Sequence, residues 1–120
     1  MPFNYLLTNL LVDVPAAVGA IFTDPEGEAV EWVTRHDDPY DLKVEGAYHS
    51  IFMRQLESAL ASSGLGELRD YTLSAQRLTS LTQSLPDGYY VTLVIDRSGS
   101  QAHAMEQLRR TAQVLAREIL

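Results

Sequence analysis

VDVPAAVGAIFTDPEGEAVEW, at residues 12–32, holds the signals around which the rest of the chain is arranged. A helical pattern stops at Pro15, because proline disfavours helix at the residue before it. The small and branched apolar residues that follow, at 16–22, are typical of a sheet strand covered closely by helices. Asp-Pro-Glu-Gly at 24–27 suits a type I turn, so a second strand should follow and pair with the first.

Outward from this stretch, apolar spacing predicts the remaining elements. The strand at 89–95 is almost continuously apolar and should be central, since it needs cover on both faces. The strands at 68–73 and 78–85 are rich in polar residues, which suits the edges of a sheet. The first half of the chain is predicted as a helix at 3–14, a strand on either side of the turn and a loop at 35–41. A helix at 42–63 follows, which Gly64 caps, and then strands at 68–73, 78–85 and 89–95. The last element is a helix that begins with a capping box formed by Ser98 and Gln101.

Composition bounds the class of protein. The 120 residues, 46% of them hydrophobic, predict a single domain over residues 1–120 with one core. The absence of cysteine excludes disulfides and thiol chemistry. With no long apolar run and no basic leader, we expect a cytoplasmic protein that has no membrane partner. The formal net charge of -7 argues against nucleic acid as a partner, because backbone phosphates attract Lys and Arg.

Acidic residues are concentrated in one part of the chain. Eight Asp and Glu residues lie within residues 24–45, opposed there by Arg35 and Lys43 alone. Such a span is either a solvated face or a patch that steers a basic partner toward the protein. If it steers a partner, Asp37, Asp38 and Asp41 are the candidates.

The helix at 42–63 has an unusually wide apolar surface. Its apolar residues cover roughly two thirds of the circumference at 100° per residue, against the ~100° stripe of an ordinary surface helix. One side can face the sheet, and the other then needs a second partner. The helix is either buried within its own domain or part of a subunit interface, and the short chain favours the interface.

No catalytic, cofactor or metal site emerges from the remaining polar residues. Asp41, Glu45 and His49 stand four apart on one helix face, but ligands on successive turns span about 12 Å, too far for one ion. His49 is better explained as a hydrogen-bonded residue beside an interface. Ser98-Gly99-Ser100 near His103 should cap a helix and is no catalytic triad. We therefore expect no enzyme.

Three arginines could in principle reach a nucleotide bound to a partner, as an arginine finger does. They are Arg35, Arg69 and Arg77. Nothing in the sequence ranks one above the others, and a solvated surface position is the simpler interpretation of each.

Taken together, these features resemble the Roadblock family of dynein-light-chain-like proteins. The resemblance covers nearly the whole chain through soft motifs of apolar spacing and glycines, without a catalytic signature. The stretches that carry it are Val14-Pro15, residues 18–24 with Gly27, the long helix around Ala47, Asp87-Gly88 before residues 91–96, and Leu108-Arg109-Arg110.

The resemblance implies an α+β fold and a mode of assembly. Its fold would be a five-stranded antiparallel sheet, Roadblock/profilin-like, in the order αββαβββα, with the long helix on one face and the terminal helices on the other. Members form homodimers or heterodimers by pairing their long helices and joining their third strands edge to edge. The dimer interface expected here comprises Val44, Ala47, Tyr48, Ile51, Phe52, Gln55, Ala59, Leu68, Asp70 and Thr72.

The resemblance also implies a partner. Bacterial members are often encoded with small Ras-like GTPases and regulate them in cell polarity and signalling. A non-enzymatic dimeric scaffold that binds such a GTPase, and stimulates its hydrolysis without an arginine finger, is the expected function. The alternative is a small-molecule sensor of profilin-like fold. A sensor needs a cavity with convergent polar groups, and the small residues at 16–20 argue against room for one.

Overall fold

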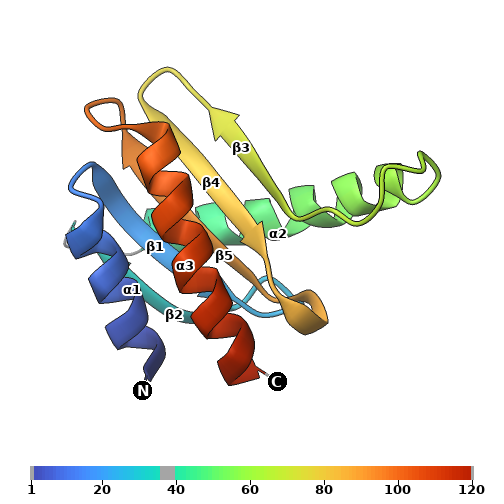
Figure 1. The fold of residues 1–120 in the computed structure, drawn as a ribbon, viewed down its shortest axis with the longest axis horizontal. Coiled ribbons are helices and arrows are strands. Elements are labelled where there is room, and N and C mark those ends of the chain that lie inside the picture. Colours follow the sequence, from blue (N-terminus) through green and yellow to red (C-terminus); the bar gives the residue numbers. More distant parts are fainter. Residues whose placement is uncertain (1, 36–39, 120) are drawn as a thin grey trace.

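All the predicted elements are present in the computed structural model, which describes residues 2–35 and 40–119. The described residues form three helices and five strands in the predicted order. Figure 1 shows their arrangement, coloured along the chain. The elements are α1 (Pro2–Asp13), β1 (Ala17–Thr23), β2 (Ala29–Thr34), α2 (Tyr40–Leu60), β3 (Asp70–Ser74), β4 (Leu78–Ser84), a 3₁₀ turn η1 (Pro86–Gly88), β5 (Tyr90–Asp96) and α3 (Gln101–Ile119). None of the described helices has the length and apolar character that crossing a membrane requires.

The strands form one antiparallel sheet in the order β2-β1-β5-β4-β3. The predicted central place of the last strand is confirmed, since β5 lies third of five. The expectation that both polar strands are edges is right for β3 and wrong for β4, which lies between β3 and β5. Ser80 and Thr82 of β4 are buried because they face α2 and find hydrogen-bond partners there or on β5.

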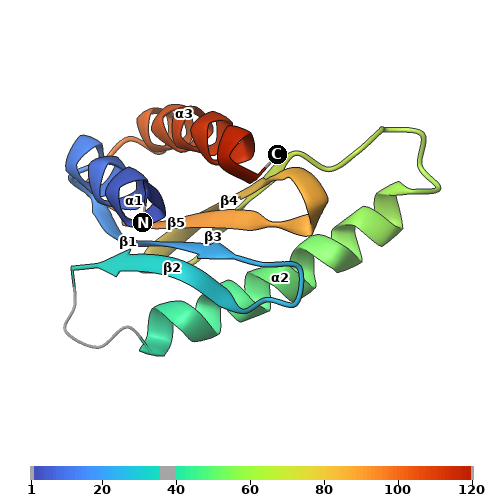
Figure 2. The ribbon, with the colours of Figure 1, turned by 90° about the horizontal axis from the view of Figure 1, so that it is seen from below.

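Helices cover both faces of the sheet, as predicted. Figure 2 shows α1 and α3 side by side on one face and α2 alone on the other. The large apolar core lies on the α1–α3 face, where Phe22, Leu93 and Leu108 are fully buried. The buried apolar cluster on the α2 face is much smaller and consists of Ile21, Leu42 and Val94.

The turn and the strand at the start of the chain form as their residues predict. Asp24 accepts a backbone hydrogen bond from Gly27 at 2.9 Å, and its Oδ1 accepts from the amides of Glu26 and Glu28, also at 2.9 Å. β1 lies inside the sheet, paired on both sides. A Cβ atom on Gly19 would meet a Leu42 methyl and the Val33 carbonyl oxygen at 3.1 Å, so the small residue is what lets α2 approach.

One capping prediction is wrong in its residue. α3 is capped by Ser100, whose Oγ accepts a hydrogen bond from the amide of His103 at 3.1 Å. The backbone amide and the hydroxyl of Ser98 instead both donate to Oδ1 of Asp96 in the preceding turn. The helix begins two residues later than a cap at Ser98 would place it, because Asp96 competes for Ser98.

Candidate interaction face

The outer side of α2 exposes large apolar side chains to solvent. Tyr48 is 56% exposed, Ile51 42%, Phe52 37% and Leu56 39%. The rings of Tyr48 and Phe52 stack on each other with centroids 6.4 Å apart, one turn apart along the helix. We call Tyr48, Ile51, Phe52 and Leu56 the outer face of α2. A contiguous exposed apolar surface of this kind marks an interaction site.

The inner side of α2, against the sheet, is small and polar. Gly46 faces Ile21 and Thr23 of β1, with so little room that a Cβ atom would lie 3.0 Å from Ile21 Cδ1. His49 and Ser50 are buried together with Met53. Gly46 and Ser50 lie on the narrow arc of the helix that the wide apolar surface leaves uncovered, and the structure turns this arc inward. The apolar side faces outward because Gly46 lets the helix pack close to the sheet, whereas larger side chains at the contact would hold it away.

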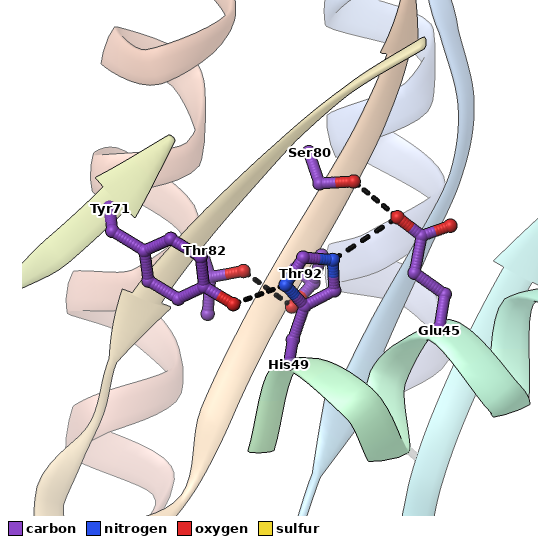
Figure 3. Close-up of polar contacts among 6 residues, drawn as sticks. All are labelled: Glu45, His49, Tyr71, Ser80, Thr82 and Thr92. Carbon is purple, nitrogen blue, oxygen red and sulfur yellow. Dashed lines mark hydrogen bonds and ion pairs between the residues drawn. The ribbon is translucent and has the colours of Figure 1, made fainter. Parts of the chain in front are cut away.

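A hydrogen-bonded cluster joins α2 to β3 and β4. It consists of Glu45, His49, Tyr71 and Ser80, and we call it the polar cluster (Figure 3). His49 Nε2 lies 3.1 Å from Glu45 Oε1, and its Nδ1 is hydrogen-bonded to the Tyr71 hydroxyl. Ser80 donates its hydroxyl to the same Glu45 oxygen. The imidazole is only 2% exposed, so its two nitrogens depend on these partners.

The protonation of the cluster follows from its hydrogen bonds. The hydrogen bond from His49 lowers the pKa of Glu45, against the opposing effect of burial, and the bond from Ser80 lowers it further. An ionised carboxylate only accepts, so His49 Nε2 carries a proton and donates it to Glu45. With the hydrogen on Nε2, Nδ1 can accept from the Tyr71 hydroxyl. Burial raises the pKa of Tyr71 to about 12, which keeps that hydroxyl a donor.

The polar cluster lies directly under the outer face. The His49 ring packs edge-on against Phe52 with centroids 5.7 Å apart, and its other neighbour is the Tyr71 ring at 5.6 Å. A single buried side chain therefore touches the exposed aromatic surface of α2 and the edge strand β3. The expectation that His49 is hydrogen-bonded is confirmed.

The predicted interface residues fall into two groups. On α2, Val44 is half-buried, and the others are exposed on the same side as the outer face: Ala47, Tyr48, Ile51, Phe52, Gln55 and Ala59. At the edge strand, Thr72 is exposed, whereas Leu68, which precedes β3, and Asp70 are half-buried. β3 pairs with β4 on one side and has no strand on the other, so its outer edge is open among the described residues.

The charged residues considered in the sequence differ in where the structure places them. Asp41 is exposed in the first turn of α2, whereas Asp37 and Asp38 lie outside the described residues. Arg69 and Arg77 are exposed, as expected.

Arg35 is exposed as well, but its guanidinium also makes defined hydrogen bonds within the chain. Its guanidinium donates to the carbonyl oxygens of Leu11 and Pro15, both at 2.7 Å, and also to that of Ala17. The Leu11 carbonyl lies in the last turn of α1 and the Pro15 carbonyl just beyond it, where helical partners run out, so Arg35 holds the end of that helix.

Sequence reasoning found part of the polar cluster and missed the rest. The spacing of Glu45 and His49 by one helical turn was visible and was weighed as a metal site. Among the described residues, no group of three His, Asp or Glu side chains is placed to hold a metal ion. Tyr71 and Ser80 gave no signal, because they lie 22 and 35 residues from their partners in the chain.

An open hollow lies beneath the C-terminal end of α2. This end runs past the sheet, as Figures 1 and 2 show, and the space below it measures about 680 Å³. Residues that line it include Glu57, Leu60, Leu68, Leu85, Gly88 and Tyr90. The small residues at 16–20 predict no room for a ligand beside their strand. They do not limit this hollow, because other parts of the chain line it.

Comparison with known proteins places the fold. No family model matches the sequence, and no curated protein matches it either. Among solved structures, a Roadblock/LC7 domain from Streptomyces avermitilis is similar with a TM-score of 0.86 at 14% identity, over 97% of this chain and 96% of that one. MglB from Myxococcus xanthus follows with 0.80 at 12% identity, over 99% and 95%. A structure described as MglB with tetrameric arrangement gives 0.78 at 18% identity, over 97% and 86%.

These likenesses define the class of fold. The chain has the Roadblock/LC7 fold, a five-stranded antiparallel sheet with one long helix on one face and two terminal helices on the other. The resemblance inferred from the sequence is confirmed at the level of the fold.

Proposed function

We propose that this chain is a non-enzymatic, cytoplasmic scaffold that dimerises through the outer face of α2 and the edge of β3 and binds a small Ras-like GTPase. The observation that carries the proposal is the outer face itself. A monomer gains nothing from exposing Tyr48, Ile51 and Phe52 while it buries Gly46 and His49. The likeness to MglB supports a GTPase as the partner, and a related domain in a heterodimer is left open.

Dimerisation is tested by charging the outer face. Ile51→Glu should give a monomer, because a carboxylate buried in an apolar interface without a partner is costly. Val12→Glu is the matched control, since Val12 is equally apolar, 69% exposed and on α1 at the opposite side of the sheet. Sedimentation equilibrium measures both. A dimer that survives Ile51→Glu unchanged contradicts the interface.

Partner binding is tested with a panel of small Ras-like GTPases, each loaded with GDP or with a non-hydrolysable GTP analogue. We expect calorimetry to show binding of the GTP-analogue form and its loss in Ile51→Glu, because the GTPase would recognise the dimer. A monomeric variant that binds with full affinity would refute the scaffold.

Any stimulation of hydrolysis should come from repositioning the groups of the GTPase itself. Arg69→Ala and Arg77→Ala should then keep most of it, whereas removal of an arginine finger costs about 10³-fold or more. Arg35→Ala is unsuitable for this test. It would free the end of α1, so a loss of stimulation would report a damaged fold.

A second candidate function rests on the hollow beneath α2. Its size falls within the range of ligand sites, roughly 300–1,000 Å³. The small-molecule sensor therefore remains the alternative, and a thermal-shift screen of metabolites against the wild-type protein would detect it.

A further inference from the structure

The buried position of His49 is not explained by packing. A polar ring that is 2% exposed costs free energy unless each nitrogen finds a partner, and an apolar side chain would fill the same space without that requirement. The chain instead provides a partner for each nitrogen, Glu45 on α2 and Tyr71 on β3. Ser80 on β4 in turn donates to Glu45, so three elements meet in the cluster. Such a cluster specifies one arrangement of these elements, which an apolar contact does not.

The edge strand β3 has few other attachments. It pairs with β4 on one side and ends the sheet on the other. Asp70 lies 3.7 Å from Arg109 of α3, but this ion pair is largely in solvent and therefore weak. Tyr71 supplies a partly buried hydrogen bond that connects the strand to α2. Elements with few buried contacts open locally more readily than the core, so this bond bears directly on where β3 lies.

His49 also supports the aromatic surface of α2. Its ring and that of Phe52 form a T-shaped pair, and Phe52 in turn stacks on Tyr48. The hydrogen bonds to Glu45 and Tyr71 fix the plane of the imidazole, and the imidazole limits the positions open to Phe52. Both parts of the interaction surface, the outer face of α2 and the edge of β3, are thus held through one side chain.

We propose that His49 is a positioning residue, which through its hydrogen bonds to Glu45 and Tyr71 sets β3 and Phe52 in the arrangement that the partner chain recognises. This inference rests on the proposed function for its binding consequence. The positioning itself is a property of the single chain. A partner would meet a preorganised surface and lose less conformational freedom on binding.

Tyr71→Phe is the sharpest test, because it removes one hydroxyl and leaves the ring in place. We expect the dimer to weaken about threefold to tenfold, the scale of one net hydrogen bond. Amide hydrogen exchange of the β3–β4 ladder should accelerate, while exchange of the β1–β5 ladder stays as in the wild type. Tyr89→Phe is the matched control: Tyr89 is half-buried on the opposite face of the sheet, against Phe22.

Variants of His49 separate positioning from simple packing. His49→Leu should weaken the dimer as Tyr71→Phe does, and the double variant should be no weaker than His49→Leu alone, since both changes remove the same bond. His49→Gln retains a donor and an acceptor and should restore part of the affinity. A purely structural role would instead lower the melting temperature in His49→Leu and Tyr71→Phe without a change in the dimer dissociation constant.

The outcomes for the two proposals are distinct. A wild-type chain that is monomeric at all concentrations refutes the proposed dimer. Exchange of the β3–β4 ladder that is unaltered in Tyr71→Phe refutes the positioning role of His49, whether the wild type is monomer or dimer. An intact dimer in which Tyr71→Phe changes neither affinity nor exchange leaves the scaffold standing and refutes this inference alone.

Discussion

The two faces of the sheet are covered in opposite ways. On the α1–α3 face, large apolar side chains such as Phe22, Leu93 and Leu108 interlock and exclude solvent. On the α2 face, the helix meets the sheet through Gly46, His49 and Ser50. On this face the sheet presents hydroxyl groups to the helix, among them those of Tyr71, Ser80, Thr82, Thr92 and Thr23.

The difference separates stability from recognition. The α1–α3 face buries most of the apolar surface, and burial of such surface is the main force that stabilises a fold. The α2 face instead uses close approach and directed hydrogen bonds, which fix geometry. It buries Leu42 and Met53 but leaves Tyr48, Ile51, Phe52 and Leu56 of the helix outside. Damage to the first face should therefore unfold the chain, whereas damage to the outer side of α2 should leave the monomer folded.

The largest effect is expected from a cavity in the α1–α3 core. Leu108→Ala should lower the free energy of unfolding by about 2–5 kcal/mol, because Leu108 is fully buried and its neighbours cannot collapse into the gap. Leu56→Ala, on the outer face of α2, should stay within about 0.5 kcal/mol. Urea unfolding of both in the Ile51→Glu background measures the monomer. Equal losses would remove the contrast between the faces.

An intermediate effect is expected where α2 touches the sheet. Gly46→Val should cost about 1–3 kcal/mol, since a Cβ there already meets Ile21 and Thr23 at 3.0 and 3.1 Å. Ala47→Val is the control, because it places the same side chain one position along on the exposed side. Urea unfolding of this pair sharpens the comparison. A Gly46→Val protein as stable as its control would mean that the helix can move away from the sheet freely.

The smallest effect concerns pH. The raised pKa of Tyr71, about 12 against an ordinary 10.0, means that the unfolded chain loses this proton first. The contribution of Tyr71 to the free energy of unfolding is complete below pH 10. It is lost as the pH rises through the pKa that Tyr71 has in the folded state. Tyr71→Phe should therefore flatten the fall in stability between about pH 10 and 12. Burial also raises the pKa of Tyr90, so some fall remains. Denaturation midpoints of the wild type and of Tyr71→Phe, measured across this pH range, test the prediction. Identical pH profiles of the two proteins would contradict the raised pKa of Tyr71.

Much of the fold was predictable because its signals are local. The helix that ends before Pro15, the turn at 24–27 and the apolar strand β5 each depend on neighbours within a few residues. The wide apolar arc of α2 was also visible, since a helical projection needs only the spacing along the chain. The prediction of a second partner for this helix followed from it.

The candidate site was predictable only in its outline. The exposed residues Tyr48, Ile51 and Phe52 were expected at an interface, and His49 was expected to be hydrogen-bonded. Its partner Tyr71 was not found, because a strand and a helix far apart in sequence meet only through the fold. Ser80 and Thr82 were misassigned to an edge strand, since polar residues in a strand indicate an open edge unless another element supplies hydrogen-bond partners.

By itself, the sequence determined the order of the elements, the turns that connect them and the wide apolar arc of α2, because repeat periods of helix and strand are set by local backbone geometry. The tertiary structure alone decided which side of α2 faces the sheet, and it did so through Gly46, whose missing side chain permits the close approach. It also decided that Arg35 holds the end of α1 and that His49 joins β3 to α2. Those roles depend on which donors and acceptors meet in space, and the spacing of residues along the chain does not predict such meetings between distant segments.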